Sequence, residues 1–170
     1  GHWAIMLSSG NYEVVLVISQ PLGGPGYSAM PADYDGDGKA DPAVYQRANG
    51  TWKILLSSFG YAPINLQNLL GGTGWRAVAA DYDGDGKADP AIYGEATGLW
   101  QIMLSSAGYW KLELPWTLGG SGYSPCPADY DGDGLADPAV YDPQSGDWHF
   151  RFSSDGYRLL EQRGMLKFRD

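Results

Sequence analysis

The sequence predicts an all-β protein, and three observations support this prediction. Its 170 residues include 25 glycines and 11 prolines, which would interrupt any long helix. Apolar and polar residues alternate with a period of two over short stretches between Gly-rich turns, a pattern typical of antiparallel strands. The same group of residues also returns about every 48 positions. An aromatic content of 14% is too high for a disordered segment.

An internal repeat runs through the whole chain. A tryptophan returns after 49, 48 and 48 residues, and an acidic hexapeptide returns twice after 48. Pairs of serine and the tripeptide Leu-Gly-Gly keep the same spacing. The markers are Trp3, Trp52, Trp100 and Trp148; the hexapeptides that begin at Asp33, Asp81 and Asp129; the pairs Ser8-Ser9, Ser57-Ser58, Ser105-Ser106 and Ser153-Ser154; and the tripeptides that begin at Leu22, Leu70 and Leu118. Because the markers stay in phase, each repeat is expected to be one structural unit.

Within one repeat we expect four strands. In the first complete repeat they cover about Tyr27–Ala32, Pro42–Gln46, Thr51–Ser57 and Ala62–Leu70. A four-stranded sheet of this size cannot bury its faces alone and must stack on its neighbours, as the blades of a β-propeller do. The sequence therefore predicts one β-propeller domain over residues 1–170, with an N-terminal half blade (1–20), three blades (21–69, 70–117 and 118–164) and a tail (165–170).

Each complete repeat carries an acidic loop between its first two strands, with the pattern D-x-D-G-D-G-x-x-D. Carboxylates at positions 1, 3, 5 and 9 are expected to surround one centre, and the backbone carbonyl at position 7 adds a further oxygen. Glycine at position 6 permits the sharp turn. The predicted metal ligands are Asp33, Asp35, Asp37, Lys39 and Asp41 in loop 1; Asp81, Asp83, Asp85, Lys87 and Asp89 in loop 2; and Asp129, Asp131, Asp133, Leu135 and Asp137 in loop 3.

The chemistry of these loops predicts three Ca²⁺ sites. Four carboxylates within nine residues repel each other strongly unless a cation lies among them. An all-oxygen ligand set favours Ca²⁺, since Mg²⁺ prefers a strict octahedron that keeps several waters. The loop is not an EF-hand, because position 12 holds Val44, Ile92 or Val140 where a bidentate Glu would belong. Of the 20 acidic residues, 12 lie in these loops, so the net charge of −9 is mainly local acidity.

These repeats resemble the FG-GAP or VCBS-type repeats of integrin α-chain propellers and of many secreted bacterial proteins. The resemblance rests on the loops that begin at Asp33, Asp81 and Asp129, and it covers nearly the whole chain. It implies a β-propeller, Ca²⁺ as a structural ion between the first two strands of a blade, and an extracellular or cell-surface location. It implies no particular activity, because members of that family serve adhesion, lectin and scaffold roles.

The number of repeats is not a whole number. His2–Ile18 form only the second half of a repeat, and residues 164–170 are too few for another strand–loop–strand. A regular closed propeller has about four to eight blades. Three closures are open at this point: the tail, about Met165–Arg169, adds a strand beside the N-terminal hairpin; the ends of neighbouring subunits complete each other; or the chain is a fragment of a larger propeller.

The two ends also differ in chemistry. The stretch Glu13–Ile18 is apolar on both faces, and a bare strand of this kind would aggregate. The last repeat has His149 and Arg151 in place of Lys53 and Leu55, and five of the eleven basic residues lie among the last twenty. These bases could contact the acidic loops of another subunit. Unlike ends favour head-to-tail self-association, which makes a fibre where the contact does not close.

The sequence offers no catalytic site. His2 and His149 belong to no recurring acid–base arrangement, and the G-x-S-x-G turn of a serine nucleophile is absent. The serine pairs occur in every repeat, which favours strand-end and turn hydrogen bonds. Nucleic-acid binding lacks supporting motifs, and no apolar stretch is long enough to cross a membrane. Cys126, at the position of Met30 and Val78, is expected to be a small core residue.

Together, these patterns predict a non-enzymatic, extracellular, calcium-binding propeller that acts as a structural or adhesive subunit and self-associates through its incomplete blade. One alternative is a lectin-like module that binds carbohydrate or a surface protein, because Trp110 and Trp116 could be exposed on the fourth strand and stack on sugar rings. Another is an accessory propeller from a larger secreted protein. Asn49-Gly50-Thr51 matches a glycosylation sequon, but we favour a hairpin turn there.

Overall fold

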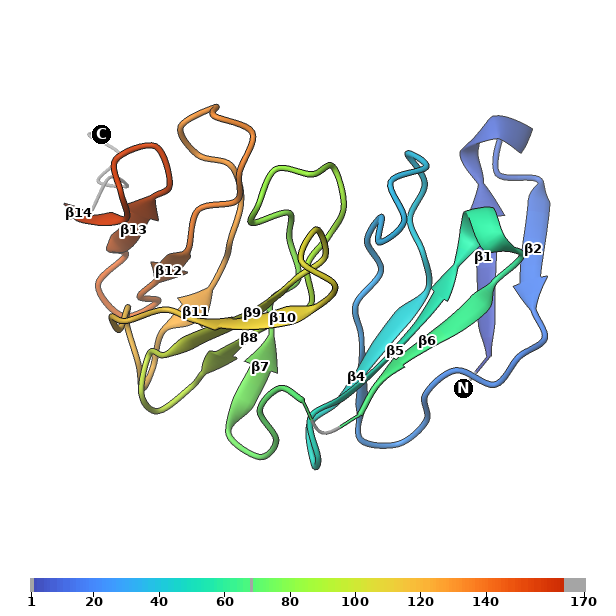
Figure 1. Ribbon diagram of the computed structural model, residues 1–170, viewed down its shortest axis with the longest axis horizontal. Helices are drawn as coiled ribbons and strands as arrows, with labels where there is room; N and C mark the ends of the chain where they lie inside the picture. The colour runs from blue at the N-terminus through green and yellow to red at the C-terminus, as the bar shows by residue number, and fades with distance from the viewer. Residues whose placement is uncertain (1, 68, 164–170) are drawn as a thin grey trace.

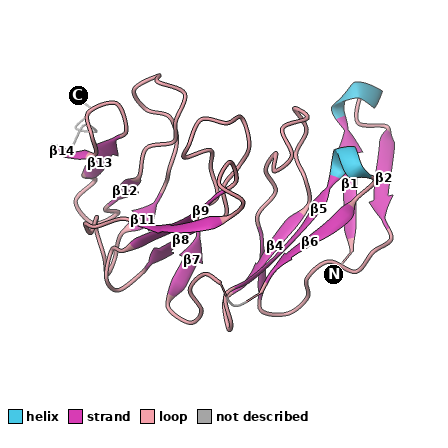
Figure 2. Cartoon of the chain, viewed as in Figure 1, coloured by secondary structure: helices cyan, strands magenta, loops and turns pink. Residues whose placement is uncertain are grey.

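The computed structural model describes residues 2–67 and 69–163. Its strands form four antiparallel sheets that follow one another along the chain, one of two strands and three of four strands. Figure 1 shows these sheets side by side in a row, with the N-terminus at one end and the C-terminus at the other. The helical segments of the described part are two short 3₁₀ turns, η1 (Ser8–Gly10) and η2 (Ser57–Phe59) (Figure 2). The all-β prediction is confirmed.

Each sheet is a simple meander of consecutive strands. The two-stranded sheet, which we call the half unit, pairs β1 (Trp3–Leu7) with β2 (Val14–Ile18). We call the four-stranded sheets units 1, 2 and 3. Unit 1 contains β3 (Tyr27–Ala29), β4 (Ala43–Gln46), β5 (Thr51–Leu56) and β6 (Ala62–Leu66); unit 2 contains β7 (Trp75–Ala77), β8 (Ala91–Gly94), β9 (Trp100–Leu104) and β10 (Trp110–Glu113); and unit 3 contains β11 (Ser124–Pro125), β12 (Ala139–Tyr141), β13 (Trp148–Phe152) and β14 (Arg158–Gln162).

All four strands of unit 1 are shorter than the sequence indicates, β4 and β5 by one residue each and the outer two strands by more. β3 ends at Ala29 rather than Ala32, because an isolated bridge at the base of the acidic loop replaces its last residues. β6 ends at Leu66 rather than Leu70. Leu70 is nevertheless buried, in the Leu-Gly-Gly segment that leads to the next unit. The predicted extra strand at Met165–Arg169 lies outside the described residues.

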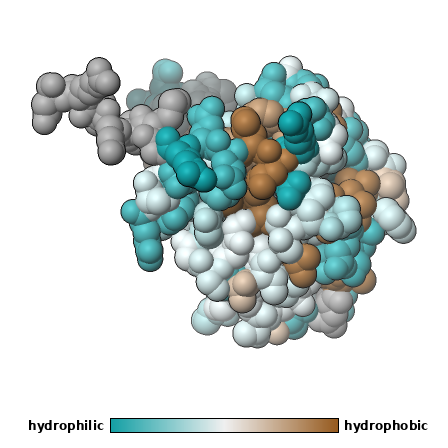
Figure 3. Space-filling model, turned by 90° about the vertical axis from the view of Figure 1, so that its left-hand side faces the viewer, coloured by the Kyte–Doolittle hydropathy of each residue, from teal (hydrophilic) through white to brown (hydrophobic). Residues whose placement is uncertain are grey.

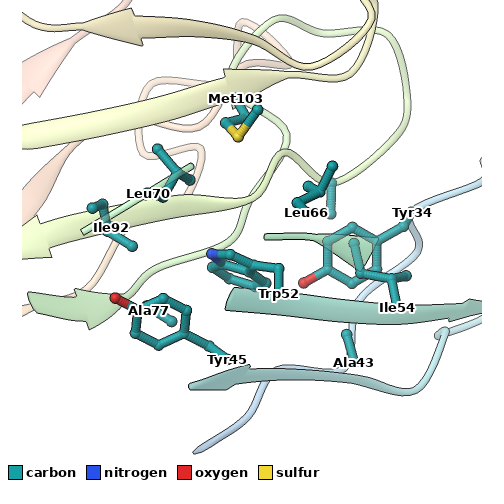
Figure 4. Packing of buried hydrophobic residues seen from close by; sticks show 11 residues of the cluster. Tyr34, Ala43, Tyr45, Trp52, Ile54, Leu66, Leu70, Ala77, Ile92 and Met103 are labelled. Atoms are coloured by element: carbon teal, nitrogen blue, oxygen red, sulfur yellow. The ribbon is translucent and has the colours of Figure 1, made fainter. Parts of the chain in front are cut away.

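The hydrophobic core lies between successive sheets. Trp52 and Ile54 of β5 and Tyr45 of β4 pack against Ile92 of β8 and Met103 of β9, and all five are buried (Figure 4). The junction between units 2 and 3 uses the equivalent side chains, namely Tyr93, Trp100 and Ile102 against Ala136 and Val140. Burial of one large apolar side chain contributes about 1.5–3 kcal/mol. Each sheet therefore depends on the next one for most of this stabilisation.

The half unit packs on unit 1 in the same way. Ile18 of β2 is buried with Val44 and Leu55 of unit 1, while Trp3 and Ile5 pack against this cluster. Trp3 and Ile5 thus take the places that Trp52 and Ile54 have at the next junction. We call the face of a sheet that points toward the following unit its forward face and the opposite face its backward face; the backward face of the half unit and the forward face of unit 3 contact no other sheet of the described chain.

A tyrosine in the left-handed region follows the turn before the last strand of each sheet. These residues are Tyr12, Tyr61, Tyr109 and Tyr157, with φ of 63°, 64°, 63° and 61°. Such a backbone costs about 1–3 kcal/mol for a bulky residue, and packing on the preceding sheet offsets this cost. Tyr61 packs against the half-unit cluster and Tyr109 against the unit 1 cluster. Tyr12 has no preceding sheet among the described residues and is 60% exposed.

The Asn49-Gly50 turn is confirmed. Gly50 has φ of +73°, and a Cβ atom there would lie 2.0 Å from the carbonyl oxygen of Leu70. Only glycine fits both the backbone conformation and this close approach. Among the described residues, no helix has the length and apolar character needed to span a membrane.

Candidate metal centres

The three acidic loops lie on the same side of the row of sheets (Figure 1). Loop 1 connects β3 to β4, loop 2 connects β7 to β8, and loop 3 connects β11 to β12. Each is closed at its base by an isolated bridge between the alanine before the loop and the aspartate at position 9, as in Ala32 and Asp41. The loops are therefore anchored to their sheets at both ends, as the sequence pattern predicts.

Each loop brings three carboxylates together. The candidate ligand atoms of Asp33, Asp35 and Asp37 lie within 4.8 Å of one another. The same holds for the equivalent carboxylates of loop 2, and for positions 1, 3 and 9 of loop 3. These are Asp81, Asp83 and Asp85, and Asp129, Asp131 and Asp137. Carboxylates so close together are strongly destabilised unless a cation neutralises them.

Backbone amides hold the first aspartate of each loop. The two carboxylate oxygens of Asp33 accept hydrogen bonds from the N–H groups of Gly36, at 2.6 Å, and Gly38, at 2.8 Å. Loops 2 and 3 repeat both bonds. The glycine at position 6 has φ of +82° in loop 1, in the left-handed region that favours glycine. The loop thus curls around the side chain at position 1.

The serine pair at the end of the third strand contacts the acidic loop of its own unit. The Ser58 hydroxyl donates to Asp35 Oδ2 at 2.7 Å, and the Ser57 hydroxyl donates to Asp37 Oδ2 at 3.2 Å. Units 2 and 3 repeat these contacts with Ser105, Ser106, Ser153 and Ser154. Sequence reasoning predicted turn hydrogen bonds for these serines but missed the carboxylate partners. The signal available was their constant distance of 20 and 23 residues from positions 5 and 3.

The aspartate at position 9 is the most buried member of each loop. Asp41, Asp89 and Asp137 are fully inaccessible to solvent. Asp41 Oδ2 accepts from the Tyr34 N–H at 2.9 Å, and Oδ1 accepts from the Ser57 N–H at 2.7 Å. Burial raises the pKa of Asp41, and it raises the pKa of Asp89 to about 6. This side chain therefore fastens the loop to the sheet, and its predicted role as a metal ligand stays a prediction.

The residue at position 7 differs between the loops. Lys39 Nζ lies 2.8 Å from Asp37 Oδ2, and its hydrogen bond lowers the pKa of Asp37. The aliphatic part of Lys87 lies instead over Gly36 of loop 1, and Leu135 lies over Gly84 of loop 2. Within the described ranges, no Lys or Arg forms an ion pair with a carboxylate of loop 2 or loop 3. The predicted ligand role of the position 7 carbonyls is not tested by these contacts.

Successive loops are also joined through their backbones. The Ala88 N–H donates to the carbonyl of Asp33 at 2.6 Å, and the Ala136 N–H donates to the carbonyl of Asp81 at 2.6 Å. Position 8 of one loop is thus bonded to position 1 of the loop before it. The carboxylate groups therefore form a connected series along one side of the molecule.

The other candidate residues are placed apart from the loops. The Cys126 thiol is half-buried, and burial raises its pKa, which fits a core residue. His149 packs edge-to-face on Tyr123, with ring centroids 5.4 Å apart. Trp110 is 63% exposed.

Trp116 and Arg151 contact each other. The Arg151 guanidinium lies 4.3 Å from the centroid of the Trp116 ring, and it donates to the carbonyls of Tyr157 and Thr117. Arg151 is therefore held within the chain by these contacts, and its contact with a partner stays a prediction. The contact with Arg151 covers one face of the Trp116 ring, which is half-buried.

The donor set of the loops suits a hard divalent cation. It consists of carboxylate oxygens held by backbone amides and serine hydroxyls, without a nitrogen or sulfur donor. Comparison with known proteins finds no match among family models, curated proteins or solved structures. The function of this protein is therefore inferred from the geometry of the loops and from the sequence.

Proposed function

We propose that this protein is a non-enzymatic, calcium-binding structural subunit that associates head-to-tail with further copies. The proposal includes a β-propeller arrangement of the units and an extracellular or cell-surface location, both of which follow from the resemblance of the acidic loops to FG-GAP and VCBS-type repeats. Two features of the molecule support it: the carboxylate groups in the loops and the uncovered faces at the two ends.

The negative charge of loops 2 and 3 supports calcium binding. Each loop holds carboxylates within 4.8 Å of one another, and no basic side chain of the described chain pairs with them. The residues that would hold the ion are those at positions 1, 3, 5 and 9 with the carbonyl at position 7. When bound, Ca²⁺ supplies the positive charge that allows these groups to stay together. The serine pair and the position 9 aspartate would then connect the ion to the third strand of the same sheet.

Self-association is supported by the backward face of the half unit, and this observation carries the proposal. Met6 occupies the place of Leu55 and Met103, which are both 3% exposed at the internal junctions, but Met6 itself is 59% exposed. Val15 and Val17 of β2 lie on the same face and are also exposed. An uncovered apolar sheet of this kind marks an interaction surface.

The forward face of unit 3 is the matching surface. Tyr130 is 41% exposed, whereas its equivalents Tyr34 and Tyr82 are 2% and 3% exposed at the internal junctions. Trp148 and Phe150 are only half-buried. Figure 3 shows this end of the molecule, where hydrophobic residues form a patch between hydrophilic ones. The two end faces thus carry the kinds of residue that pack together inside the chain, and a contact between them would continue the existing row of sheets.

A variant on the half unit tests this proposal. Val17→Lys should abolish concentration-dependent assembly, because a charge would be buried in the contact. Asn65→Lys is the matched control, since Asn65 occupies the same place in β6 as Val17 in β2 and is exposed. Light scattering and electron microscopy with and without calcium would measure assembly. A wild-type chain that stays monomeric at high concentration with calcium bound would contradict self-association.

A carbohydrate-binding module is the second candidate, favoured by one observation. Trp110 is 63% exposed on β10, and a free indole ring can stack on a sugar. Trp116 is less suited to this role, because Arg151 lies over one face of its ring. Binding on a glycan array that is lost in Trp110→Ala would support this candidate, and absence of binding to any glycan would count against it.

A further inference from the structure

The half unit has a serine pair, and no acidic loop precedes this pair among the described residues. Ser8 and Ser9 occupy the places of Ser57 and Ser58, at the end of β1 and in η1. In units 1, 2 and 3 this pair donates to the carboxylates at positions 3 and 5 of the loop in the same unit. Ser8 and Ser9 are exposed, and neither hydroxyl has a hydrogen-bond partner among the described residues.

A groove lies beside this serine pair. It has a volume of about 470 Å³ and is lined by residues of the half unit on one side and of unit 1 on the other. Ser8, Ser9 and Met6 contribute from the half unit, while Lys39 and Ala40 contribute from loop 1. The groove therefore separates the serine pair from positions 7 and 8 of loop 1.

Loop 1 lacks the contact that the other loops make with a preceding loop. At the internal junctions, the N–H at position 8 donates to a position 1 carbonyl, and the side chain at position 7 lies over a position 4 glycine. In loop 1, position 7 is Lys39 and position 8 is Ala40. The Ala40 N–H is exposed and has no acceptor in the part of the chain that the structure describes. A loop placed in the groove would meet Ser8 and Ser9 on one side and Ala40 on the other.

The edge of β1 completes the site. In the three full units the third strand pairs with the second strand in one register, with Ala91 opposite Ile102 and Tyr93 opposite Trp100 in unit 2. Among the described residues β1 pairs only with β2, which leaves its other edge open to an added strand. In the same register, an added strand of this sequence would place its alanine opposite Ile5 and its tyrosine opposite Trp3.

We propose that the half unit binds a strand–acidic loop–strand segment, equivalent to the first half of a repeat, and that this creates a fourth calcium site. Ser8 and Ser9 donate to the carboxylates at positions 5 and 3 of the incoming loop, and the Ala40 N–H donates to its position 1 carbonyl. The inference rests on the proposed function and deepens it, because it names the kind of segment that the half unit binds. It does not require that the donor be a second copy of this chain.

A peptide with the sequence of residues 75–95 tests the pairing, since it contains β7, loop 2 and β8. Fluorescence anisotropy of the labelled peptide with the full chain should show one-to-one binding in calcium and loss of binding in excess chelator. Bound calcium should rise from three to four per chain when the peptide is added. A control peptide with Asp83→Asn and Asp85→Asn should bind at least about tenfold more weakly, because the charged acceptors of the serine hydroxyls are lost.

Variants of the chain locate the binding site. Ser8→Ala with Ser9→Ala should weaken peptide binding about tenfold. Ser19→Ala, which follows β2 in the same half unit, should leave it unchanged. Circular dichroism would establish that both variants are folded.

A variant in which the segment is covalently joined to the chain tests the inference even if the separate peptide binds weakly. Residues 75–97 placed directly before Gly1 give the half unit the spacing that unit 2 has before Trp100. This longer chain should bind four calcium ions and melt at a higher temperature than the original chain. Three ions in the longer chain, together with no peptide binding, would overturn the inference and leave the proposed function intact. A chain that binds the peptide but neither assembles nor loads its own three loops would contradict the proposed function alone.

Discussion

Units 2 and 3 have the same topology and nearly the same acidic loop, but equivalent residues in them are buried to different extents. Trp100 and Tyr82 of unit 2 are inaccessible or nearly so, whereas Trp148 is half-buried and Tyr130 is 41% exposed. The difference arises because unit 3 covers the forward face of unit 2, whereas no described sheet covers the forward face of unit 3. Core formation in this molecule is therefore a property of junctions between sheets rather than of single sheets.

The largest expected effect is that of calcium removal. Excess chelator should sharply lower the melting temperature, because each occupied site stabilises the fold by about 2.7 kcal/mol when free calcium exceeds Kd a hundredfold. Calorimetry should show saturation near three ions per chain. An unchanged melting temperature in chelator would contradict a structural role for the ion.

Variants within the loops sharpen the comparison of units 2 and 3. Asp83→Asn with Asp85→Asn should lower stability more than Asp131→Asn with Asp133→Asn. Loop 2 is bonded to loops on both sides, through Ala88 and Ala136, whereas loop 3 is bonded only to loop 2. Thermal melts at saturating calcium would measure both. Equal losses would show that the loops act independently.

The tryptophans at the two junctions should give the next largest difference. Trp100→Ala should cost about 3–5 kcal/mol of unfolding free energy, because the side chain is fully buried. Trp148→Ala should cost only about 1–2 kcal/mol in dilute solution, since part of this side chain is exposed. Denaturant titration at low protein concentration would compare them. If the two costs are the same, the forward face of unit 3 is already covered in the dilute protein.

Much of this organisation could be predicted from the sequence. The 48-residue period, the acidic loops and the glycines at φ-positive turns are local patterns, so Trp52, Asp33 and Gly50 are identified without coordinates. The extent of burial of Trp148 could not be predicted, because the same residue is buried or half-buried depending on whether a further sheet follows. The pairing of Arg151 with Trp116 joins residues 35 positions apart in sequence in two different units, and no repeated pattern indicates it.

The bonds within the candidate metal sites can likewise be divided into those that the sequence predicts and those that it does not. The carboxylates at positions 1, 3 and 5 were found from their spacing alone. The serine hydroxyls that hold them come from the end of another strand, and their orientation depends on the 3₁₀ turn at Ser57. The contact of Ala88 with Asp33 is a backbone bond between units, and side-chain patterns carry no information about such a bond.

A smaller effect is expected at the glycines of position 4. Gly84 and Gly132 have φ of +76° and +83°, so Ala at either position costs about 1–2 kcal/mol from the left-handed backbone. Gly84→Ala should cost about 1 kcal/mol more, because its Cβ would lie 3.2 Å from Leu135 Cδ1, while nothing lies within 4 Å at Gly132. Melting temperatures of the two variants would test this. The reverse order would mean that another molecule covers Gly132.

The smallest effect concerns the two ion pairs of Glu95, one of which joins units 1 and 2. The Glu95 carboxylate accepts a hydrogen bond from Arg47 of unit 1. It also accepts one from Arg76 of unit 2, at 3.0 Å, and the side chains of all three residues are partly exposed to solvent. Glu95→Gln should cost at most about 1 kcal/mol, and the loss should vanish at high salt. Unit 3 has Pro143 at this position, so the junction between units 2 and 3 forms without such a pair. A salt-independent loss would assign Glu95 a packing role instead.

The junctions between loops use atoms that hardly depend on residue type. The bonds run between backbone groups, and the side chain at position 7 contacts the preceding loop through aliphatic carbons that Lys87 and Leu135 both provide. Nothing in these contacts specifies which unit must follow which. Recombination between gene segments that encode neighbouring repeats would therefore leave these loop contacts unchanged, although it would alter the side-chain contacts that are particular to one junction.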